Sequence, residues 1–122
     1  MSAASRIVIQ TIHENVTVAT IEDSSMIDPA QIEEVKTVLF DLIDKQDRRK
    51  LILDMTKVQY LSSAALGVLI PLQEKYKKAK GSMVLVGVSE SIMKLFTITC
   101  LDKLLQFAPT EAKALSILGV AV

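Results

Sequence analysis

The stretch from residue 51 to residue 67 constrains the fold most, because it passes from an apolar strand into a helix within a few residues. Leu51-Ile52-Leu53 is a short uninterrupted apolar run, typical of a strand that is covered on both faces. After a short connection, Ser62-Ser63-Ala64-Ala65-Leu66 begins a helical pattern with two hydroxyls. A helix N-terminus presents unpaired backbone N–H groups and the positive end of the peptide dipole, so it favours an anion.

The segments on either side of this stretch continue the alternation of strand and helix. Strands are predicted at 7–12, 16–21, 51–53, 83–86 and 104–107, and helices from Pro29 to near Gln46, from Ser63 to near Lys80, after Ser89 and after Thr110. The first two strands flank a polar turn at 13–15 and are expected to form an antiparallel hairpin. Strand–helix–strand units connect parallel strands by right-handed crossovers. The expected fold class is therefore α/β, one domain over residues 1–122, with a mixed, mostly parallel sheet of four to five strands, the N-terminal hairpin and about four helices.

Charge and hydropathy argue against several classes of partner. Fourteen basic and fourteen acidic residues cancel, so no whole-molecule field is expected to attract nucleic acid or anionic lipid. The longest apolar run, at 64–72, is far shorter than the ~20 residues of a membrane span, so no membrane insertion is expected. The N-terminal residues show no secretory signal pattern, and the expected location is cytoplasmic.

The sequence also lacks the motifs that are typical of enzyme active sites. It has no glycine-rich phosphate loop, no nucleophile elbow and no paired histidines. One cysteine and one histidine cannot build a metal cluster of nitrogen and sulfur ligands, so neither a metal nor a cofactor is expected. Asp28, Asp54 and Asp102 are interpreted as a helix cap, a strand end and a solvated loop residue. No catalytic activity is expected.

The opening stretch resembles the serine motif of STAS domains, the family of anti-sigma factor antagonists and of the cytosolic tails of sulphate transporters. The residues that carry the resemblance are 53–55 and 60–69, and similarity extends from the hairpin through Ile27-Asp28 to 81–86 and Leu95-Phe96. The resemblance implies a STAS-like fold. In single-domain members, a partner kinase that is also an anti-sigma factor phosphorylates a serine at this helix start. The dephosphorylated form binds that kinase and frees the sigma factor, and a phosphatase resets the cycle.

The resemblance assigns roles to two residues and leaves three departures. Ser63 matches the phosphorylated serine, and Asp28 matches an acidic residue near that site. Ser62 stands where antagonists usually carry aspartate, Ala65 stands in place of a common glycine, and no glycine precedes Ile27-Asp28. Ser62 is therefore a rival acceptor.

Local chemistry leaves two interpretations of these serines. Most serines at helix starts are only caps, worth ~1 kcal/mol. A phosphate on Ser63 would be favoured by ~0.3–2 kcal/mol at the helix N-terminus and would obstruct a partner docked on it. The expected partner-binding residues are Met26, Ile27, Asp28, Leu61, Ser62, Ala64 and Ala65. Met26, Ile27 and Leu61 would be apolar anchors if exposed, and the small side chains of Ala64 and Ala65 would let a partner approach the helix start.

Two functions remain open at this level. The expected function is that of an anti-sigma factor antagonist that binds an anti-sigma factor serine kinase and is switched by phosphorylation of Ser63. The alternative is an unmodified STAS adaptor that docks on a transporter ATPase or on a larger signalling assembly. The loss of the preceding aspartate slightly favours the adaptor.

Overall fold

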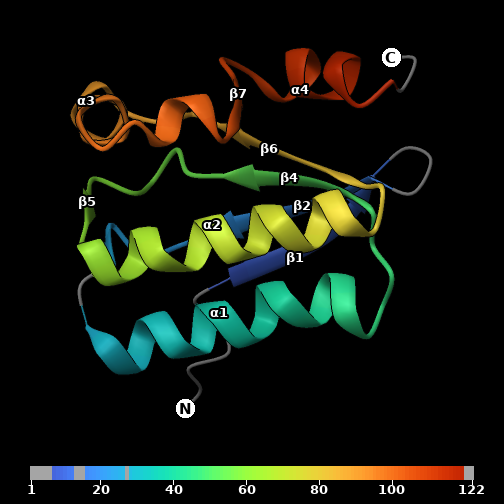
Figure 1. Ribbon diagram of the computed structural model, residues 1–122, viewed down its shortest axis with the longest axis horizontal. Helices are drawn as coiled ribbons and strands as arrows, with labels where there is room; N and C mark the ends of the chain where they lie inside the picture. Colours follow the sequence, from blue (N-terminus) through green and yellow to red (C-terminus); the bar gives the residue numbers. More distant parts are fainter. Residues whose placement is uncertain (1–6, 13–15, 27, 120–122) are drawn as a thin grey trace.

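The computed structural model describes residues 7–12, 16–26 and 28–119 (Figure 1). These residues form seven strands, four α-helices and one 3-10 turn. The strands are β1 (Ile7–Ile12), β2 (Val16–Ile21), β3 (Ser25–Met26), β4 (Lys50–Asp54), β5 (Tyr60–Leu61), β6 (Ser82–Val86) and β7 (Gln106–Ala108). The helices are α1 (Pro29–Asp44), α2 (Ser63–Lys78), α3 (Glu90–Ile98) and α4 (Glu111–Ile117), with the 3-10 turn η2 at Leu101–Lys103.

The main sheet has the strand order β1-β2-β4-β6-β7. β1 runs antiparallel to β2, and every other neighbouring pair in this sheet is parallel. The predicted α/β fold, with its N-terminal hairpin, mostly parallel sheet and four helices, is confirmed. The turn predicted at 13–15 lies outside the described residues. The predicted edge strand begins two residues later than expected and ends one residue later, because η2 precedes it and the side chain of Leu104 is exposed.

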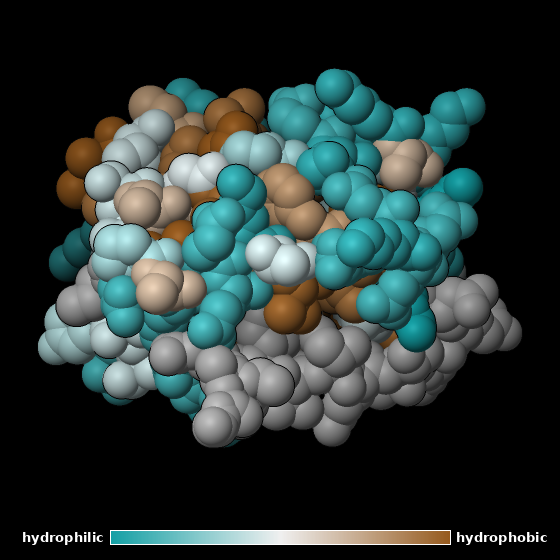
Figure 2. All heavy atoms as spheres, turned by 90° about the horizontal axis from the view of Figure 1, so that it is seen from below, coloured by the Kyte–Doolittle hydropathy of each residue, from teal (hydrophilic) through white to brown (hydrophobic). Residues whose placement is uncertain are grey.

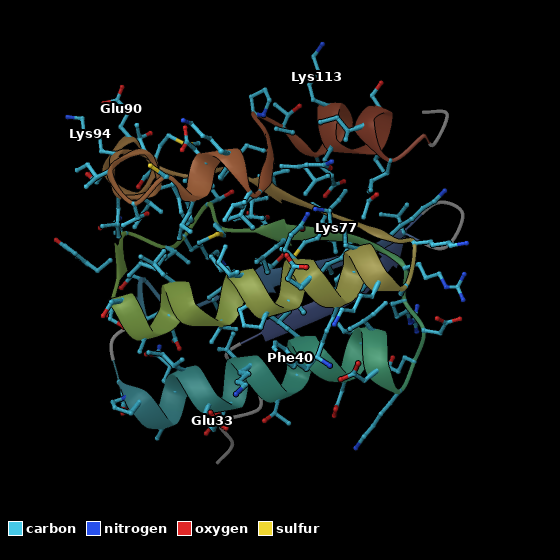
Figure 3. All side chains as sticks on the ribbon, in the orientation of Figure 1. Glu33, Phe40, Lys77, Glu90, Lys94 and Lys113 are labelled. Atoms are coloured by element: carbon cyan, nitrogen blue, oxygen red, sulfur yellow. The ribbon has the colours of Figure 1, made fainter. Side chains whose placement is uncertain are left out.

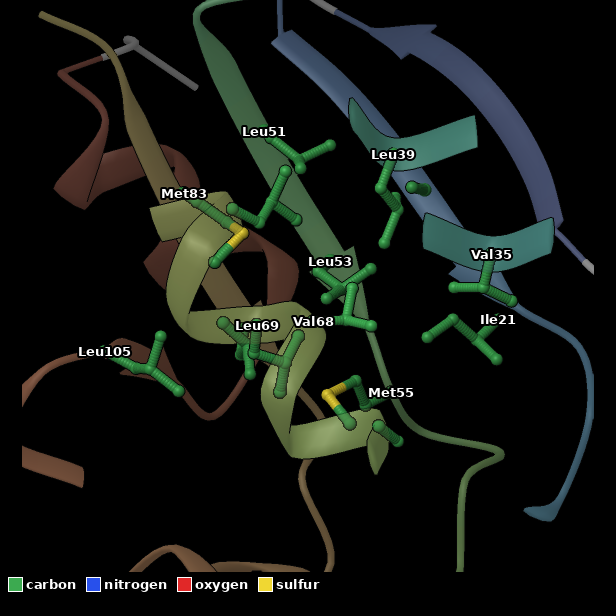
Figure 4. Close-up of a cluster of buried hydrophobic side chains, with 14 of the residues drawn as sticks. Ile21, Val35, Leu39, Leu51, Leu53, Met55, Val68, Leu69, Met83 and Leu105 are labelled. Atoms are coloured by element: carbon green, nitrogen blue, oxygen red, sulfur yellow. The ribbon is translucent and has the colours of Figure 1, made fainter. Parts of the chain in front are cut away.

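The central strand β4 explains why the main sheet is covered on both faces. Side chains alternate along a strand, so Leu51 and Leu53 point to one face and Ile52 to the other. All three side chains are fully buried. Leu51 and Leu53 pack in the larger core with α1 and α2, as Figure 4 shows, whereas Ile52 packs in the smaller core with α4. The uninterrupted apolar run is therefore the sequence of a strand between two cores.

The helices α1 and α2 pack side by side and run in the same direction. Each helix runs in the direction opposite to β2, β4 and β6. Both helices therefore begin at the end of the sheet where β2 and β4 end (Figure 1). Binding sites in open α/β sheets form at this end, because the connections between strands and helices gather there. The fold thus places the N-terminus of α2 at the end of the sheet that is best suited to a site.

Tyr76 gives a testable prediction about the core. Its side chain is fully buried in α2, and its hydroxyl has no hydrogen-bond partner among the described residues. Removing an unpaired buried hydroxyl is expected to be neutral or stabilising, by up to ~1 kcal/mol. Burial also raises the pKa of Tyr76. The phenol therefore ionises first in the unfolded chain, and its ionisation lowers the unfolding free energy only above pH ~10.

The measurement is urea unfolding of the wild type and of Tyr76→Phe between about pH 7 and pH 11. Tyr76→Phe is expected to match or exceed the wild type at neutral pH, and its advantage is expected to grow above pH ~10. A clear loss of stability at neutral pH would show that the hydroxyl makes a stabilising interaction.

Candidate functional site

A short two-stranded sheet fixes the two helix starts beside each other. β3 and β5 are parallel, with Ser25 opposite Tyr60 and Met26 opposite Leu61. The N–H of Gln59 donates to the Ser24 carbonyl at 2.7 Å. These strands are the segments that lead into α1 and α2, so their pairing holds the starts of both helices at one corner of the molecule. No pattern in the sequence predicts this pairing.

Ser62 and Ser63 occupy different places at the start of α2. Ser62 is the N-cap: its Oγ accepts from the N–H of Ala65 at 3.3 Å, and its own N–H donates to the Met26 carbonyl at 3.1 Å. Ser63 is the first helical residue, and its side chain is exposed. Its hydroxyl has no hydrogen-bond partner in the described part of the chain. Of these two hydroxyls, that of Ser63 is the one that is exposed and makes no hydrogen bond to a described residue.

Asp28 is the N-cap of α1, as predicted. Its Oδ1 accepts a hydrogen bond from the N–H of Ala30 at 3.1 Å. Pro29 takes the first helical position, where a backbone N–H would have no partner within the helix, so the missing N–H of proline costs no hydrogen bond. The side chain of Asp28 is exposed. The β3–β5 pairing places this carboxylate at the same corner as the start of α2, because Asp28 follows Met26 by two residues and Ser62 follows Leu61 directly.

The structure separates the other predicted site residues into surface and core. Ala64 is exposed and Leu61 is half-buried, so both reach the surface at the helix start. Met26 and Ala65 are only 4% and 1% exposed and pack in the larger core. Their side chains are not available to a partner, which corrects the expectation of an anchor at Met26 and of a close-approach position at Ala65. Ile27 lies outside the described residues.

Tyr60 is a surface residue that the sequence reasoning missed. It lies in β5 directly before the helix start, and its side chain is 64% exposed, whereas nearby Val58 is buried. The segment Val58-Gln59-Tyr60-Leu61 is too short to show which apolar side chain faces inward. Figure 2 views the molecule from the side of α1, and apolar surface gathers at the end where α1 and α2 begin.

A small cavity lies beneath this corner in the described part of the chain. This cavity has a volume of about 10 Å³ and is lined by apolar side chains, among them Met26, Leu61 and Ala65. That volume holds one water at most. Across the described ranges, no group of three or more His, Cys, Asp or Glu side chains is arranged to hold a metal ion. Every helix in those ranges is too short or too polar to cross a bilayer.

The two serines are expected to differ in their effect on stability. Ser62→Ala removes the cap of α2 and is expected to lower the unfolding free energy by ~1 kcal/mol. Ser63→Ala removes no hydrogen bond and places a good helix former in the first turn, so the expected change is within ~0.5 kcal/mol. Urea unfolding of the two variants checks this difference. Equal losses in both variants would show that Ser63 also has a structural role.

Comparison with known proteins identifies the family. The model of the STAS domain matches residues 8–114. The anti-sigma-B factor antagonist of Listeria monocytogenes is 30% identical over 61 residues, which are 50% of this chain and 54% of that protein. The chain thus spans about half the length of the curated relatives it matches.

Solved structures share the fold at low sequence identity. The Thermotoga maritima protein tm1081 superposes with a TM-score of 0.83 at 17% identity, covering 96% of this chain and 97% of that one. The Bacillus protein SpoIIAA in its phosphorylated form superposes with a TM-score of 0.70 at 15% identity, covering 91% and 97%. The family model covers well over half of the sequence, and the fold agrees along nearly the whole chain. This protein belongs to the STAS domain family.

Proposed function

We propose that this chain is an anti-sigma factor antagonist whose binding to an anti-sigma factor serine kinase is switched off by phosphorylation of Ser63. A cognate phosphatase restores binding. The observation that carries the proposal is the exposed hydroxyl of Ser63, at the first position of a helix on a surface corner, with no hydrogen bond to any described residue. The similarity to proteins named anti-sigma-B factor antagonists, and to SpoIIAA, solved in a phosphorylated form, supports it.

Phosphorylation at this position would change binding more than folding. The phosphate adds about 1.5 to 2 negative charges beside the backbone N–H groups of the first helical turn, which favour an anion. The fold is therefore expected to persist. A partner packed against the same surface would have to bury a dianion, and that desolvation is unfavourable. The serine thus controls whether the corner is available to a partner.

Ser63 is the better acceptor of the two serines. The Oγ of Ser62 already accepts a hydrogen bond from the N–H of Ala65, and the residue is half-buried. Serine and aspartate are both good N-caps, so Ser62 keeps the structural role of the aspartate that antagonists usually carry there. It does not keep the negative charge. We therefore expect the partner kinase to recognise a less acidic sequence around its substrate serine.

The partner surface of this proposal consists of side chains that reach the corner. Asp28 provides a carboxylate, Tyr60 a large amphipathic ring, and Leu61 and Ala64 apolar contact. Tyrosine is enriched among the residues that dominate binding energy in interfaces, and Tyr60 is the expected anchor. Ile27 stays in the proposed surface on sequence grounds. Met26 and Ala65 support the surface from the core.

Gly67 gives a further prediction about this surface. It lies in α2 one turn after Ser63, is exposed, and an added Cβ would meet no atom within 4 Å. Glycine inside a helix costs ~0.5–1 kcal/mol relative to alanine, so Gly67→Ala is expected to stabilise the fold by that amount. The same methyl group would hold a partner away from the helix backbone and is expected to weaken partner capture.

Thermal unfolding and partner capture measured on the same Gly67→Ala protein check both effects. Ala112→Gly is the matched control, because it changes the same atoms in the opposite direction at an exposed position of α4, which contributes no residue to the proposed surface. If the Gly67→Ala variant is stabilised and captures its partner as well as the wild type does, Gly67 does not lie in the interface.

The experiment that tests the proposal is phosphopeptide mapping of the protein from its own cells, combined with partner capture by the wild type, Ser63→Ala and Ser62→Ala. We expect phosphate on Ser63, and stronger capture of an anti-sigma factor kinase by Ser63→Ala. Absence of phosphate from both serines, with capture unchanged in both variants, would overturn the proposal. Capture of a transporter subunit in that case would support the unmodified adaptor.

A further inference from the structure

The net charge of zero conceals a strong separation of charge between the two ends of the molecule. The connections that follow α1 and α2 meet at the end opposite the serines, where the N–H of Ser82 donates to the Arg49 carbonyl at 2.7 Å. We call residues 45–50 and 75–80 the basic end. It carries eight basic residues and one acidic residue, a net charge of +7, which leaves six basic and thirteen acidic residues in the rest of the chain.

The opposite end of the molecule is acidic. We call residues 22–34 and 54–63 the acidic end; it contains the starts of both helices and the serines. Six acidic residues and one basic residue give it a net charge of −5. In Figure 3, Glu33 lies on α1 towards the end where the helices begin, and Lys77 lies on α2 towards the end where they finish. A helix of 16 residues is ~24 Å long, about three Debye lengths at physiological salt, so each end acts separately on a partner.

Internal pairing explains only part of the basic end. Lys45 pairs with Asp41, Arg49 with Asp47 and Lys75 with Asp44. Counting the flanking acids Asp41, Asp44 and Glu74 with the basic end still leaves a net charge of +4. Among the described residues, no ion pair is found for four lysines of this end, which are Lys50, Lys77, Lys78 and Lys80.

Interaction with the helix dipole does not explain the remaining positive charge of the basic end either. Basic residues in the last turn stabilise the negative end of the helix dipole, and α2 has three of them. The last turn of α1, however, contains no basic residue, and the charges at Arg48, Arg49 and Lys50 lie beyond it. Those residues line a hollow of about 470 Å³ together with Gln46 and Asp47. The basic end is therefore both charged and concave.

We infer that the basic end of one copy of this protein docks onto the acidic end of a second copy. The chain itself carries the complementary charge. No large apolar side chain is exposed at residues 45–50 or 75–80, and the aromatic ring of Tyr76 is buried, so this end has neither an anchor for lipid nor a stacking surface for bases. The contact joins two different surfaces, so it produces chains or rings rather than a two-fold dimer.

Such a contact would cover the corner that contains Ser63. Self-association and capture of the partner would then compete for one surface, which is a consequence that rests on the proposed function. The association itself does not depend on that function, because it needs only the two charged ends. Attraction between exposed charges is screened by salt, so the assembly is expected to be weak and to dissociate as ionic strength rises.

The test uses two reversals of charge on the full chain, followed by sedimentation velocity at about 20 mM and about 300 mM salt. Lys50→Glu, Lys77→Glu and Lys78→Glu together bring the basic end from +7 to +1. Glu22→Lys, Glu33→Lys and Glu34→Lys together bring the acidic end from −5 to +1. Thermal unfolding of each variant establishes that it is folded.

We expect the wild type to associate at low salt with rising protein concentration, and its association constant to fall at least about tenfold at high salt. Each variant alone is expected to be monomeric, and a mixture of the two to associate, because the acidic end of one still meets the basic end of the other. A wild type that is monomeric throughout, or a mixture that does not associate, would overturn the inference. Binding of duplex DNA or phosphatidylserine vesicles through the same lysines, without self-association, would overturn it in favour of another polyanion.

Discussion

Ser63→Glu is expected to weaken binding of the anti-sigma factor kinase by about 100-fold or more while leaving the fold intact. The carboxylate would stand at the first position of α2, exposed in the free protein and stabilised by the helix N-terminus. In the complex it would be buried without a counter-charge, which costs ~3–5 kcal/mol, and each 1.4 kcal/mol changes a dissociation constant about tenfold. Calorimetric titration of the purified partner measures the change directly.

Ser91→Glu is the matched control for this variant. Ser91 is also an exposed serine in the first turn of a helix, α3, but that helix contributes no residue to the proposed surface. Both variants add one negative charge at a helix N-terminus, and both are expected to keep the unfolding free energy of the wild type within ~0.5 kcal/mol. Equal losses of binding in both would mean that total charge, rather than the position of Ser63, controls the partner.

Leu53→Ala is expected to lower the unfolding free energy by ~2–5 kcal/mol. Leu53 is fully buried in the central strand and packs in the larger core between the sheet and the two helices (Figure 4). Truncation removes buried apolar surface and leaves a cavity that the paired backbone of β4 cannot collapse to fill. Equilibrium unfolding in urea, followed by circular dichroism, gives the size of the loss.

Ile98→Ala is the control for the core prediction. It also truncates a large aliphatic side chain in a regular element, but this side chain is 77% exposed at the end of α3. Its expected effect is within ~0.5 kcal/mol. Comparable losses at the two positions would contradict the assignment of Leu53 to the main core.

The sequence by itself determined those features whose cause is local. The apolar run Leu51-Ile52-Leu53 predicted the central strand, because only a strand between two cores buries side chains on both faces. Asp28 before Pro29, and Ser89 before the third helix, predicted helix starts, because capping depends on residues within one turn. The presence of serine at the start of α2 follows from the same local chemistry.

The structure was also needed to show that Ser62 caps α2 whereas Ser63 is exposed. Both serines are acceptable N-caps, and the sequence left Ser62 as a rival of Ser63 for the phosphate. The N–H of Ser62 is fixed to the Met26 carbonyl, which places its Oγ over the first turn and leaves Ser63 exposed. That hydrogen bond joins segments 36 residues apart in the chain.

Only the tertiary structure decided what lies at the corner and how charge is distributed. Pairing of β3 with β5 brings the starts of α1 and α2 together, turns Met26 inward and leaves Tyr60 outward. The parallel course of the two helices gathers basic residues at one end and acidic residues at the other, although the totals cancel. The physical reason is that burial and surface charge depend on contacts between distant segments, whereas strand patterns and helix caps depend on neighbours along the chain.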